Sequence, residues 1–387
     1  MSKTLDETTK NPKLSFKLNM QSYALIIALI LIAVIFGVLT GGEFLSSRNL
    51  SNLFTQMTVI SVLAIGMTLI IVAGHIDLSV GSLAGLTGGI AAILHVWFGW
   101  DSFWVVIAAI IAGALLGLWQ GWWVAYRAVP SFIVTLGGML IFRGILIGIS
   151  KGQTVAPLED SFKMIANSYL PYSIGYILAF ASIILLFLST WRNRSKRVQL
   201  GLLITNPIFS YGKLMIYSLA ILVLTYMLSR YYGVPLPLLI VIVLGGLFIF
   251  ISYKTSFGRY IYAIGGNAEA AALSGINIKR NILYVFVLMG ALAGIAGVIL
   301  TSRLNAATVS AGDMYELDAI AACVIGGTSL MGGRGNIVGA IIGALIMASI
   351  DNGMSMMNIQ TFWQYIVKGL ILIVAVWIDI SSKKEAA

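Results

Sequence analysis

The feature that most constrains this chain is a succession of long apolar stretches. Each is close in length to the roughly 20 helical residues that cross a bilayer core about 30 Å thick. Only 10% of the 387 residues are charged, against about 25% in soluble domains, so the sequence lacks a water-facing surface. The stretches do not alternate apolar and polar residues as membrane-barrel strands do, so helices are predicted. The stretches run 23–41, 57–74, 82–99, 103–126, 130–149, 172–190, 212–229, 235–252, 282–301, 318–333, 335–350 and 361–378.

The distribution of basic residues predicts the orientation of the chain. If every stretch crosses, seventeen of the 24 Lys and Arg residues fall on the side of the N-terminus and five on the opposite side. Basic residues accumulate in cytoplasmic loops. Both ends of the chain are therefore predicted to be cytoplasmic.

Two of the stretches read as broken or re-entrant segments. The residues near 74–89 and 318–333 are rich in Gly, Ser and Thr, and each segment carries an acidic residue. If one such pair does not cross, ten crossings remain and neither end changes side. The sequence thus predicts an all-α polytopic membrane protein with about 10 transmembrane helices, within a range of 10–12.

One transmembrane domain accounts for almost the whole chain. It is predicted to cover residues 23–380, between a cytoplasmic N-terminal tail at 1–22 and a cytoplasmic tail at 381–387. The first stretch has no small-residue cleavage site and reads as an uncleaved anchor. The polar connections are too short for a soluble domain, at roughly 20–30 residues in the longest three, which are 150–171, 191–211 and 253–281.

Motifs for catalysis or metal binding are missing from the sequence. There is no G-x-x-x-x-G-K-[ST] phosphate loop, no H-E-x-x-H and no G-x-S-x-G. One cysteine and two histidines exclude an internal disulfide and leave a metal site thinly supplied. We expect no catalytic residue and no metal site, so uphill transport would draw on an ion gradient or on an ATP-hydrolysing partner.

The ion-gradient alternative requires carboxylates buried in the membrane. Four acids qualify, namely Asp77, Glu316, Asp318 and Asp351, and all four lie beside loops or Gly-rich breaks. Acids at such positions are typical caps of helix N-termini, where the helix dipole stabilises them. The capping interpretation is favoured, and no proton relay is evident.

The partner alternative requires a cytoplasmic docking element, and residues 265–280 fit one. Asn267 is a suitable N-cap, Glu269 falls in the first turn, and Gly275 permits a left-handed stop. The product is a short helix of small residues followed by two basic ones. A plain surface helix between two spans would look the same. The candidate coupling residues are Asn267, Glu269, Ala270, Ala271, Gly275, Asn277, Lys279 and Arg280.

The run from Glu269 to Gly275 resembles the opening of the EAA loop, the coupling element of membrane subunits in bacterial ATP-binding-cassette importers. The usual continuation, Ile-x-Leu-Pro, is replaced at 285–288, as in the looser loops of the ribose, galactose and xylose permeases. Further segments resemble signatures of that monosaccharide branch, and the last two are most similar to permeases for D-xylose. The segments are 73–82, 129–136, 315–322, 326–333, 120–127 and 351–357.

The resemblance implies an inner-membrane permease that imports a monosaccharide such as D-xylose. It implies a permease homodimer bound to a separate ABC ATPase subunit, which would hold the ATP and magnesium, and fed by a periplasmic sugar-binding protein. No nucleic acid is expected as a partner, and no cofactor on this chain. The candidate pathway residues are the polar groups beside the breaks or within apolar stretches: Asp77, Ser79, Arg143, Glu316, Asp318 and Asn352.

Two other functions remain open at this stage. A stand-alone ion-coupled sugar transporter would work without an ATPase. A membrane enzyme acting on lipid-linked sugars would need acids at one interface, whereas Asp77 and Glu316 fall on opposite sides if all stretches cross. Of the two charges inside apolar stretches, Arg143 is expected to pair with an acid or line the pathway, and Lys368 to snorkel.

Glycines recur at spacing four in four rows, which lets helices approach closely. We expect most rows to pack inside the subunit and about one in four to face a partner copy. The rows are Gly81/Gly85/Gly89, Gly113/Gly117/Gly121, Gly290/Gly294 and Gly339/Gly343.

Overall fold

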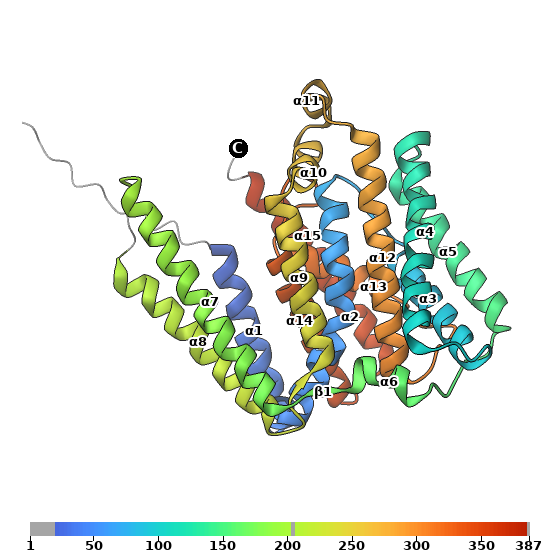
Figure 1. The fold of residues 1–387 in the computed structure, drawn as a ribbon, viewed down its shortest axis with the longest axis horizontal. Coiled ribbons are helices and arrows are strands. Elements are labelled where there is room, and N and C mark those ends of the chain that lie inside the picture. The colour runs from blue at the N-terminus through green and yellow to red at the C-terminus, as the bar shows by residue number, and fades with distance from the viewer. Residues whose placement is uncertain (1–19, 203–205, 385–387) are drawn as a thin grey trace, which may run out of the picture.

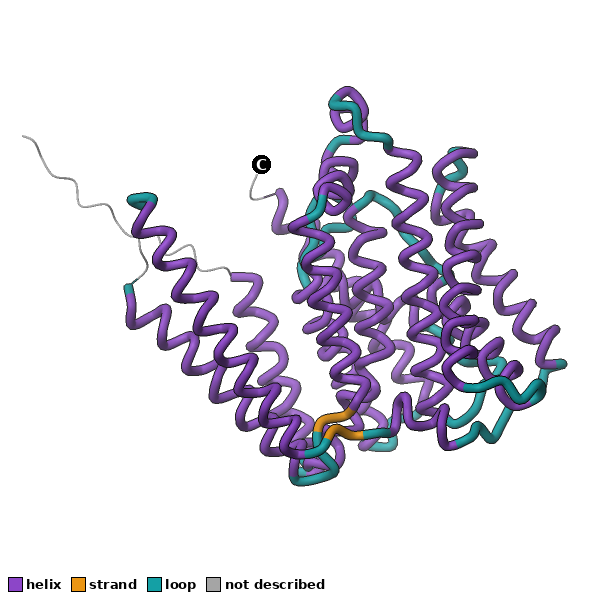
Figure 2. The backbone as a smooth tube through the Cα atoms, in the orientation of Figure 1, coloured by secondary structure: helices purple, strands orange, loops and turns teal. Residues whose placement is uncertain are grey.

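A computed structural model describes residues 20–202 and 206–384. Within these residues the chain is helical apart from two two-residue strands and the loops (Figure 2). The helices are α1 (Met20–Leu39), α2 (Ser47–Val72), α3 (Val80–Val96), α4 (Ser102–Arg127), α5 (Ser131–Ser150), α6 (Asp160–Asn167), α7 (Tyr172–Gln199), α8 (Pro207–Ser229), α9 (Leu236–Lys254), α10 (Ser256–Gly266), α11 (Ala268–Leu273), α12 (Ile278–Leu304), α13 (Tyr315–Ile325), α14 (Ile337–Met356) and α15 (Thr361–Lys384).

The predicted all-α polytopic class is confirmed. In the described part of the chain, nine helices are long and apolar enough to cross a membrane, and α3 and residues 24–39 of α1 form shorter apolar helices. Two predicted connections contain more helix than expected. The 191–211 connection is largely helical because α7 continues to Gln199 and α8 begins at Pro207, and the 253–281 connection contains α10 and α11.

Both predicted breaks are present, with shifted boundaries. Helix α2 ends at Val72, an irregular segment follows at 73–79, and α3 then runs unbroken from Val80. Gly74 has φ +86°, a conformation that glycine adopts without steric cost and that ends the helix. The second break lies on both sides of α13, at 305–314 and 326–336. With 11 residues, α13 is about 16 Å long and traverses only part of a bilayer core.

Helix α2 lies at the centre of the bundle, against α9, α12, α13 and α14 (Figure 1). Its residues are buried almost throughout, and the helix is apolar on every side. A helix that is apolar all round is typical of such a central position.

Close helix approach explains the rows of glycines. A Cβ atom on Gly113 or Gly117 would collide with the backbone of α12 at Gly290 or Phe286, and one on Gly343 would collide with Ala322 in α13. The row at Gly81 packs against residues 311–316. All four rows therefore face neighbours inside the subunit. The expectation that most rows pack internally is confirmed, and the expectation of one row facing a partner copy is wrong for these glycines.

Helices α7 and α8 form a hairpin that leans away from the rest of the bundle (Figures 1 and 2). Its buried residues lie only at one end, where α7 begins and α8 ends: Gly175, Ala179, Thr225 and Leu228. At this end the strands β1 (Tyr169–Leu170) and β2 (Val234–Pro235) pair antiparallel and link the hairpin to α9. The other end of the hairpin is exposed along both helices.

Candidate functional site

The predicted docking element is a short helix at one end of the molecule. Asn267 caps α11, since its Oδ1 accepts a hydrogen bond of 2.9 Å from the backbone N–H of Ala270. Glu269 lies in the first turn. Gly275 follows the helix with φ +81°, so the left-handed stop expected from the sequence is present. The local signals in residues 267–275 thus predicted the geometry correctly.

Helix α11 projects beyond the membrane-spanning helices (Figure 1). Ala271 is the residue that packs inward, while Asn267, Glu269 and Ala270 are exposed. Leu273 is 91% exposed, the most exposed large apolar side chain among the described residues. Sequence reasoning missed Leu273, although a large apolar residue in an otherwise small-residue helix was the available signal. Single exposed apolar side chains are normal on protein surfaces, so it is the position of Leu273 on a projecting helix that makes it a candidate contact.

The next helix begins immediately after this element. Asn277 Oδ1 accepts a 3.0 Å hydrogen bond from the backbone N–H of Arg280 and so caps α12. The Arg280 guanidinium donates to the Tyr284 hydroxyl at 2.8 Å, and Lys279 is exposed. Helix α12 has 27 residues, a length of about 40 Å. A displacement of α11 would therefore act directly on a helix that crosses the whole bundle.

Helix α10 connects the docking element to both breaks. Gly265 lies so close to Val72 and Gly333 that a Cβ atom there would collide with their backbones. The Tyr262 hydroxyl donates to the carbonyl of Gly335 at 2.9 Å, and the N–H of Gly333 donates to the carbonyl of Val72 at 2.9 Å. The end of α2 and the loop at 326–336 are thus packed against the same helix.

The first break contains a buried polar network. Asp77 Oδ1 accepts hydrogen bonds from the N–H and the hydroxyl of Ser79, at 2.8 and 2.7 Å. Ser79 Oγ in turn accepts from Gln120 Nε2 of α4 at 2.8 Å. All three side chains are buried. Asp77 therefore stabilises the turn before α3, whereas Ser79 is the N-cap residue of that helix, and Gln120 is a partner that sequence reasoning missed.

The two breaks meet inside the bundle. A Cβ atom on Gly81 would collide with Glu316 Oε2 and with the carbonyl of Gly312. The start of α3, three residues after Asp77, contacts Glu316. The full-crossing prediction that Asp77 and Glu316 fall on opposite sides therefore fails at the start of this helix. The reason is that the extended segment 73–79 enters the bundle before α3 begins, and 305–314 brings the start of α13 to the same place.

Arg143 of α5 holds the loop that precedes α13. Its Nη1 donates to the carbonyls of Val309 and Ala311 at 2.6 and 2.9 Å. Its Nη2 lies 3.7 Å from Asp313 Oδ1. The predicted pairing with a nearby acid is confirmed.

Substituting Arg143 by Gln is expected to lower the free energy of unfolding by about 2–3 kcal/mol, because two hydrogen bonds to a charged group are lost. The measurement is the midpoint of thermal unfolding of the purified protein. Arg230→Gln, which changes an exposed arginine at the end of α8, is the matched control. Equal midpoints for the two variants would contradict the role given to Arg143.

A cluster of three charges, of which Asp318 is fully buried and Lys368 and Asp351 are partly exposed, joins the last three helices. Lys368 Nζ of α15 lies 2.9 Å from Asp318 Oδ2 of α13 and 2.8 Å from Asp351 Oδ2 of α14. The expectation that Lys368 snorkels is therefore wrong, because two acids from neighbouring helices compensate its charge at depth. In the described part of the chain, the second oxygen of each acid, Oδ1, has no hydrogen-bond partner.

Asn352 connects α14 to α2. Its Oδ1 accepts from Asn49 Nδ2 at 2.9 Å, and its Nδ2 donates to Gln56 Oε1 at 3.3 Å. Two polar cavities adjoin this contact, one of about 200 Å³ bordered by Gln56 and Asp351 and one of about 560 Å³ bordered by Asn49. Arg303 borders both cavities. Arg303 lies outside the segments that resemble family signatures, and sequence reasoning missed it.

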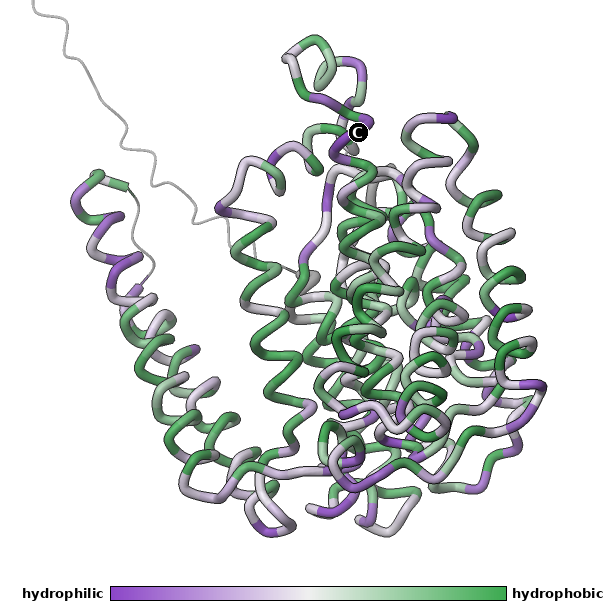
Figure 3. The backbone as a smooth tube through the Cα atoms, turned by 45° about the vertical axis from the view of Figure 1, so that its right-hand side comes forward, coloured by the Kyte–Doolittle hydropathy of each residue, from purple (hydrophilic) through white to green (hydrophobic). Residues whose placement is uncertain are grey.

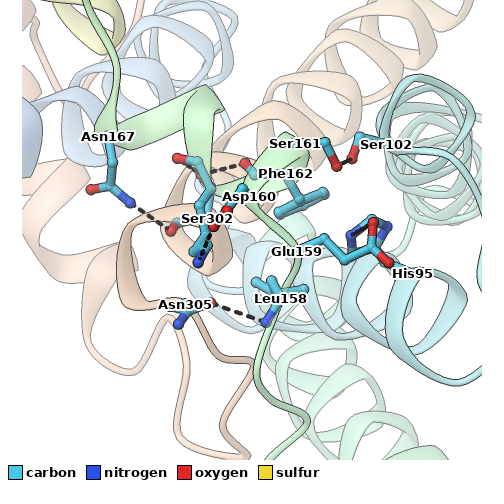
Figure 4. A network of polar contacts seen from close by, with 11 residues as sticks. His95, Ser102, Leu158, Glu159, Asp160, Ser161, Phe162, Asn167, Ser302 and Asn305 are labelled. Carbon is cyan, nitrogen blue, oxygen red and sulfur yellow. Dashed lines mark hydrogen bonds and ion pairs between the residues drawn. The ribbon is translucent and has the colours of Figure 1, made fainter.

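A third polar network fixes helix α6 against the end of α12 opposite to α11 (Figure 4). Ser302 Oγ donates to the carbonyl of Phe162 at 2.8 Å and accepts from the N–H of Ala166 at 3.0 Å. Asn305 Oδ1 accepts from the N–H of Leu158 at 3.0 Å.

The described residues contain no cluster of His, Cys, Asp or Glu that would hold a metal ion.

Comparison with known proteins decides the family. The family model described as branched-chain amino acid transport system / permease component matches residues 49–376. The chain belongs to this permease family. The match contains both breaks, the predicted coupling loop and every candidate pathway residue. As a permease component, the protein is a multi-pass membrane subunit of a transport system rather than an enzyme.

Individual relatives narrow the branch within the permease family. The chain is 51% identical to the xylose transport system permease protein XylH of Escherichia coli over 371 residues, 95% of this chain and 94% of the relative. It is likewise 51% identical to XylH of Haemophilus influenzae, over 95% and 98% of the two chains. Identity to the ribose import permease protein RbsC of Escherichia coli is 35%, over 95% of each chain. No solved structure matches the permease.

Proposed function

We propose that this permease imports D-xylose through the bacterial inner membrane, driven by a separate ATP-binding-cassette ATPase. The observation that carries the proposal is the 51% identity to xylose permeases along nearly the full length of both chains, against 35% to a ribose permease. The chain itself binds no cofactor in this proposal, because the ATP and magnesium belong to the ATPase subunit.

The ATPase subunit docks on α11 in this proposal. The projecting helix, its capped ends and the exposed Leu273 side chain support this assignment. Helix α11 is then cytoplasmic. The C-terminal end of α15 lies toward the same end of the molecule as α11 (Figure 1), which supports a cytoplasmic C-terminus. The N-terminal tail lies outside the described residues, and its proposed cytoplasmic side rests on the excess of basic residues there.

The remaining partners follow from the same assignment. A periplasmic sugar-binding protein delivers the sugar to the opposite end, where α6 and the β1–β2 pair lie, and two copies of the permease form a homodimer. No nucleic acid takes part. The four rows of glycines give no support to any particular dimer face, since they pack against neighbours within the subunit.

The pathway proposal now distinguishes between the candidate residues. Asp318 and Asn352 remain candidates beside polar cavities. Lys368 joins Asp318 to Asp351, which borders one cavity, and Asn49, which bonds to Asn352, borders the other. Asp77 bonds to Ser79, and Ser79 also bonds to Gln120. Arg143 holds the 305–314 loop, and Glu316 packs beside Gly81. We assign these four to shaping the breaks through which the sugar passes rather than to binding it.

Stand-alone ion coupling is the second candidate function. The observation that favours it is the cluster of Asp318, Asp351 and Lys368, since titratable groups within membrane spans are typical of ion-coupled transporters. A membrane enzyme acting on lipid-linked sugars has no comparable support from the family.

Uptake measurements separate the two candidates. Cells that lack their own xylose permease are expected to accumulate labelled xylose when they carry this chain together with its ATPase. Removal of the ATPase should abolish accumulation, whereas collapse of the ion gradient by a protonophore at maintained ATP should not. Uptake that survives without the ATPase and fails with the protonophore would overturn ATP coupling. If unlabelled ribose inhibited the uptake of labelled xylose as strongly as unlabelled xylose does, the assignment of xylose as the substrate would be overturned.

A further inference from the structure

The free end of the α7–α8 hairpin carries a polar cavity. Among the described residues, the buried positions of the hairpin lie at its other end, and both helices are largely exposed near this cavity. Figure 3 shows hydrophilic residues gathered at the upper end of the hairpin, above a mainly hydrophobic length. This is the end of the molecule from which α11 projects (Figure 1).

Basic side chains from both helices converge on this cavity. It has a volume of about 290 Å³ and is bordered by Arg194 and Arg197 of α7 and by Lys213 of α8. Arg194 Nη1 donates to Ser210 Oγ at 3.1 Å, and its guanidinium lies 5.5 Å from the centre of the Tyr211 ring. Arg194 is thereby oriented across the gap between the two helices.

The charge of this region is one-sided. The sequence has no Asp or Glu between residues 161 and 268, a segment that contains the whole hairpin. An excess of basic residues at the cytoplasmic side accounts for their presence. It does not account for their convergence on one concavity, because Arg192 and Lys196 on the same helix are exposed and do not border it.

We propose that this cavity binds the headgroup of an anionic phospholipid of the inner leaflet. Arginine and lysine are the side chains that bind phosphate oxygens, and basic pockets between membrane helices are typical anionic-lipid sites. Leu186, Leu214 and Tyr217 also border the cavity and provide an apolar wall for the glycerol and the first part of the acyl chains.

A lipid fits the position better than a soluble anion. The cavity opens between two helices whose outer faces expose Leu185, Ile216 and Leu219 along the expected acyl-chain region. A bound phospholipid would cover this end of the hairpin, where the described residues of α7 and α8 are largely exposed. The site is independent of the cargo that the permease carries.

The test compares two matched pairs of substitutions in the purified full-length chain. Native mass spectrometry would measure the affinity for added phosphatidylglycerol, with phosphatidylcholine as the neutral lipid. We expect Arg197→Gln with Lys213→Gln to weaken phosphatidylglycerol binding about ten-fold, equivalent to about 1.4 kcal/mol. Arg192→Gln with Lys196→Gln removes the same charge from positions that do not border the cavity and should leave the affinity nearly unchanged.

Three results would overturn the proposal. An equal loss in both pairs would mean that general positive charge attracts the lipid. Equal binding of phosphatidylcholine by the unsubstituted chain would exclude an anionic headgroup site. Competition by free glycerol phosphate as strong as by the lipid would assign the cavity to a soluble anion. If the cavity pair does not fold, a photoreactive phosphatidylglycerol should cross-link the unsubstituted chain within residues 186–217, and labelling elsewhere alone would also overturn it.

Discussion

Replacing Gly275 by arginine is expected to abolish sugar uptake while leaving the permease folded in the membrane. The backbone at Gly275 has φ +81°, a conformation that costs a non-glycine residue about 1–2 kcal/mol. The turn that closes α11 would therefore change, and a bulky charge would be added to the surface proposed to meet the ATPase. Folding should survive, because among the described residues no atom lies within 4 Å of a Cβ atom placed there.

The comparison variant for this experiment is Gly152→Arg. Gly152 also has a positive φ of +71° and open space around it, but it follows α5 at the opposite end of the molecule from α11. Both variants should reach the membrane in normal amounts, and only Gly275→Arg should lose uptake. Leu273→Ser, which removes an apolar contact without adding charge, should also reduce uptake. Normal transport by Gly275→Arg would rule out the coupling role of α11.

Substitution of Lys368 by methionine should have the largest effect on stability. Lys368 forms ion pairs with the fully buried Asp318 and with the partly exposed Asp351. Removing one member of a buried ion pair costs about 3–5 kcal/mol, because the opposite charge is left uncompensated. The thermal unfolding midpoint in detergent should fall markedly. Lys254→Met, at an exposed position at the end of α9, should not change it.

Neutralising the whole cluster separates stability from transport. The triple variant Lys368→Met, Asp318→Asn and Asp351→Asn removes all three charges, and replacement of complete buried ion clusters is often neutral or stabilising. We expect it to recover the unfolding midpoint and to keep ATP-driven uptake. A triple variant that is stable but does not transport would favour the ion-coupled alternative, in which these groups carry the coupling ion.

Local signals predicted the geometry of residues 267–275, whereas the pairings between distant segments were not predicted. Asn267 and Gly275 act on the backbone within three residues of themselves, so their roles follow from sequence order alone. The partners of Lys368 lie 50 and 17 residues away on two other helices. Which helices become neighbours depends on the packing of the whole bundle, so this cluster could not be read from the sequence.

The meeting of the two breaks shows the same limitation. Composition located both irregular segments, because glycine and polar residues interrupt apolar stretches visibly. The full-crossing prediction assigned each acid to one side of the membrane by counting the apolar stretches before it. Such a count cannot represent a helix that begins within the bundle. The contact between Gly81 and Glu316 depends on how far segment 73–79 penetrates, which is a three-dimensional property.

The central position of α2 has a consequence for biogenesis. Its neighbours α12, α13 and α14 are synthesised more than 200 residues after it. Until these helices have been synthesised, α2 must lie in lipid or against the insertion machinery. It is stable there because it is apolar on all sides. The bundle therefore closes late, and nascent chains that stop before residue 278 should be substrates for membrane quality-control proteases.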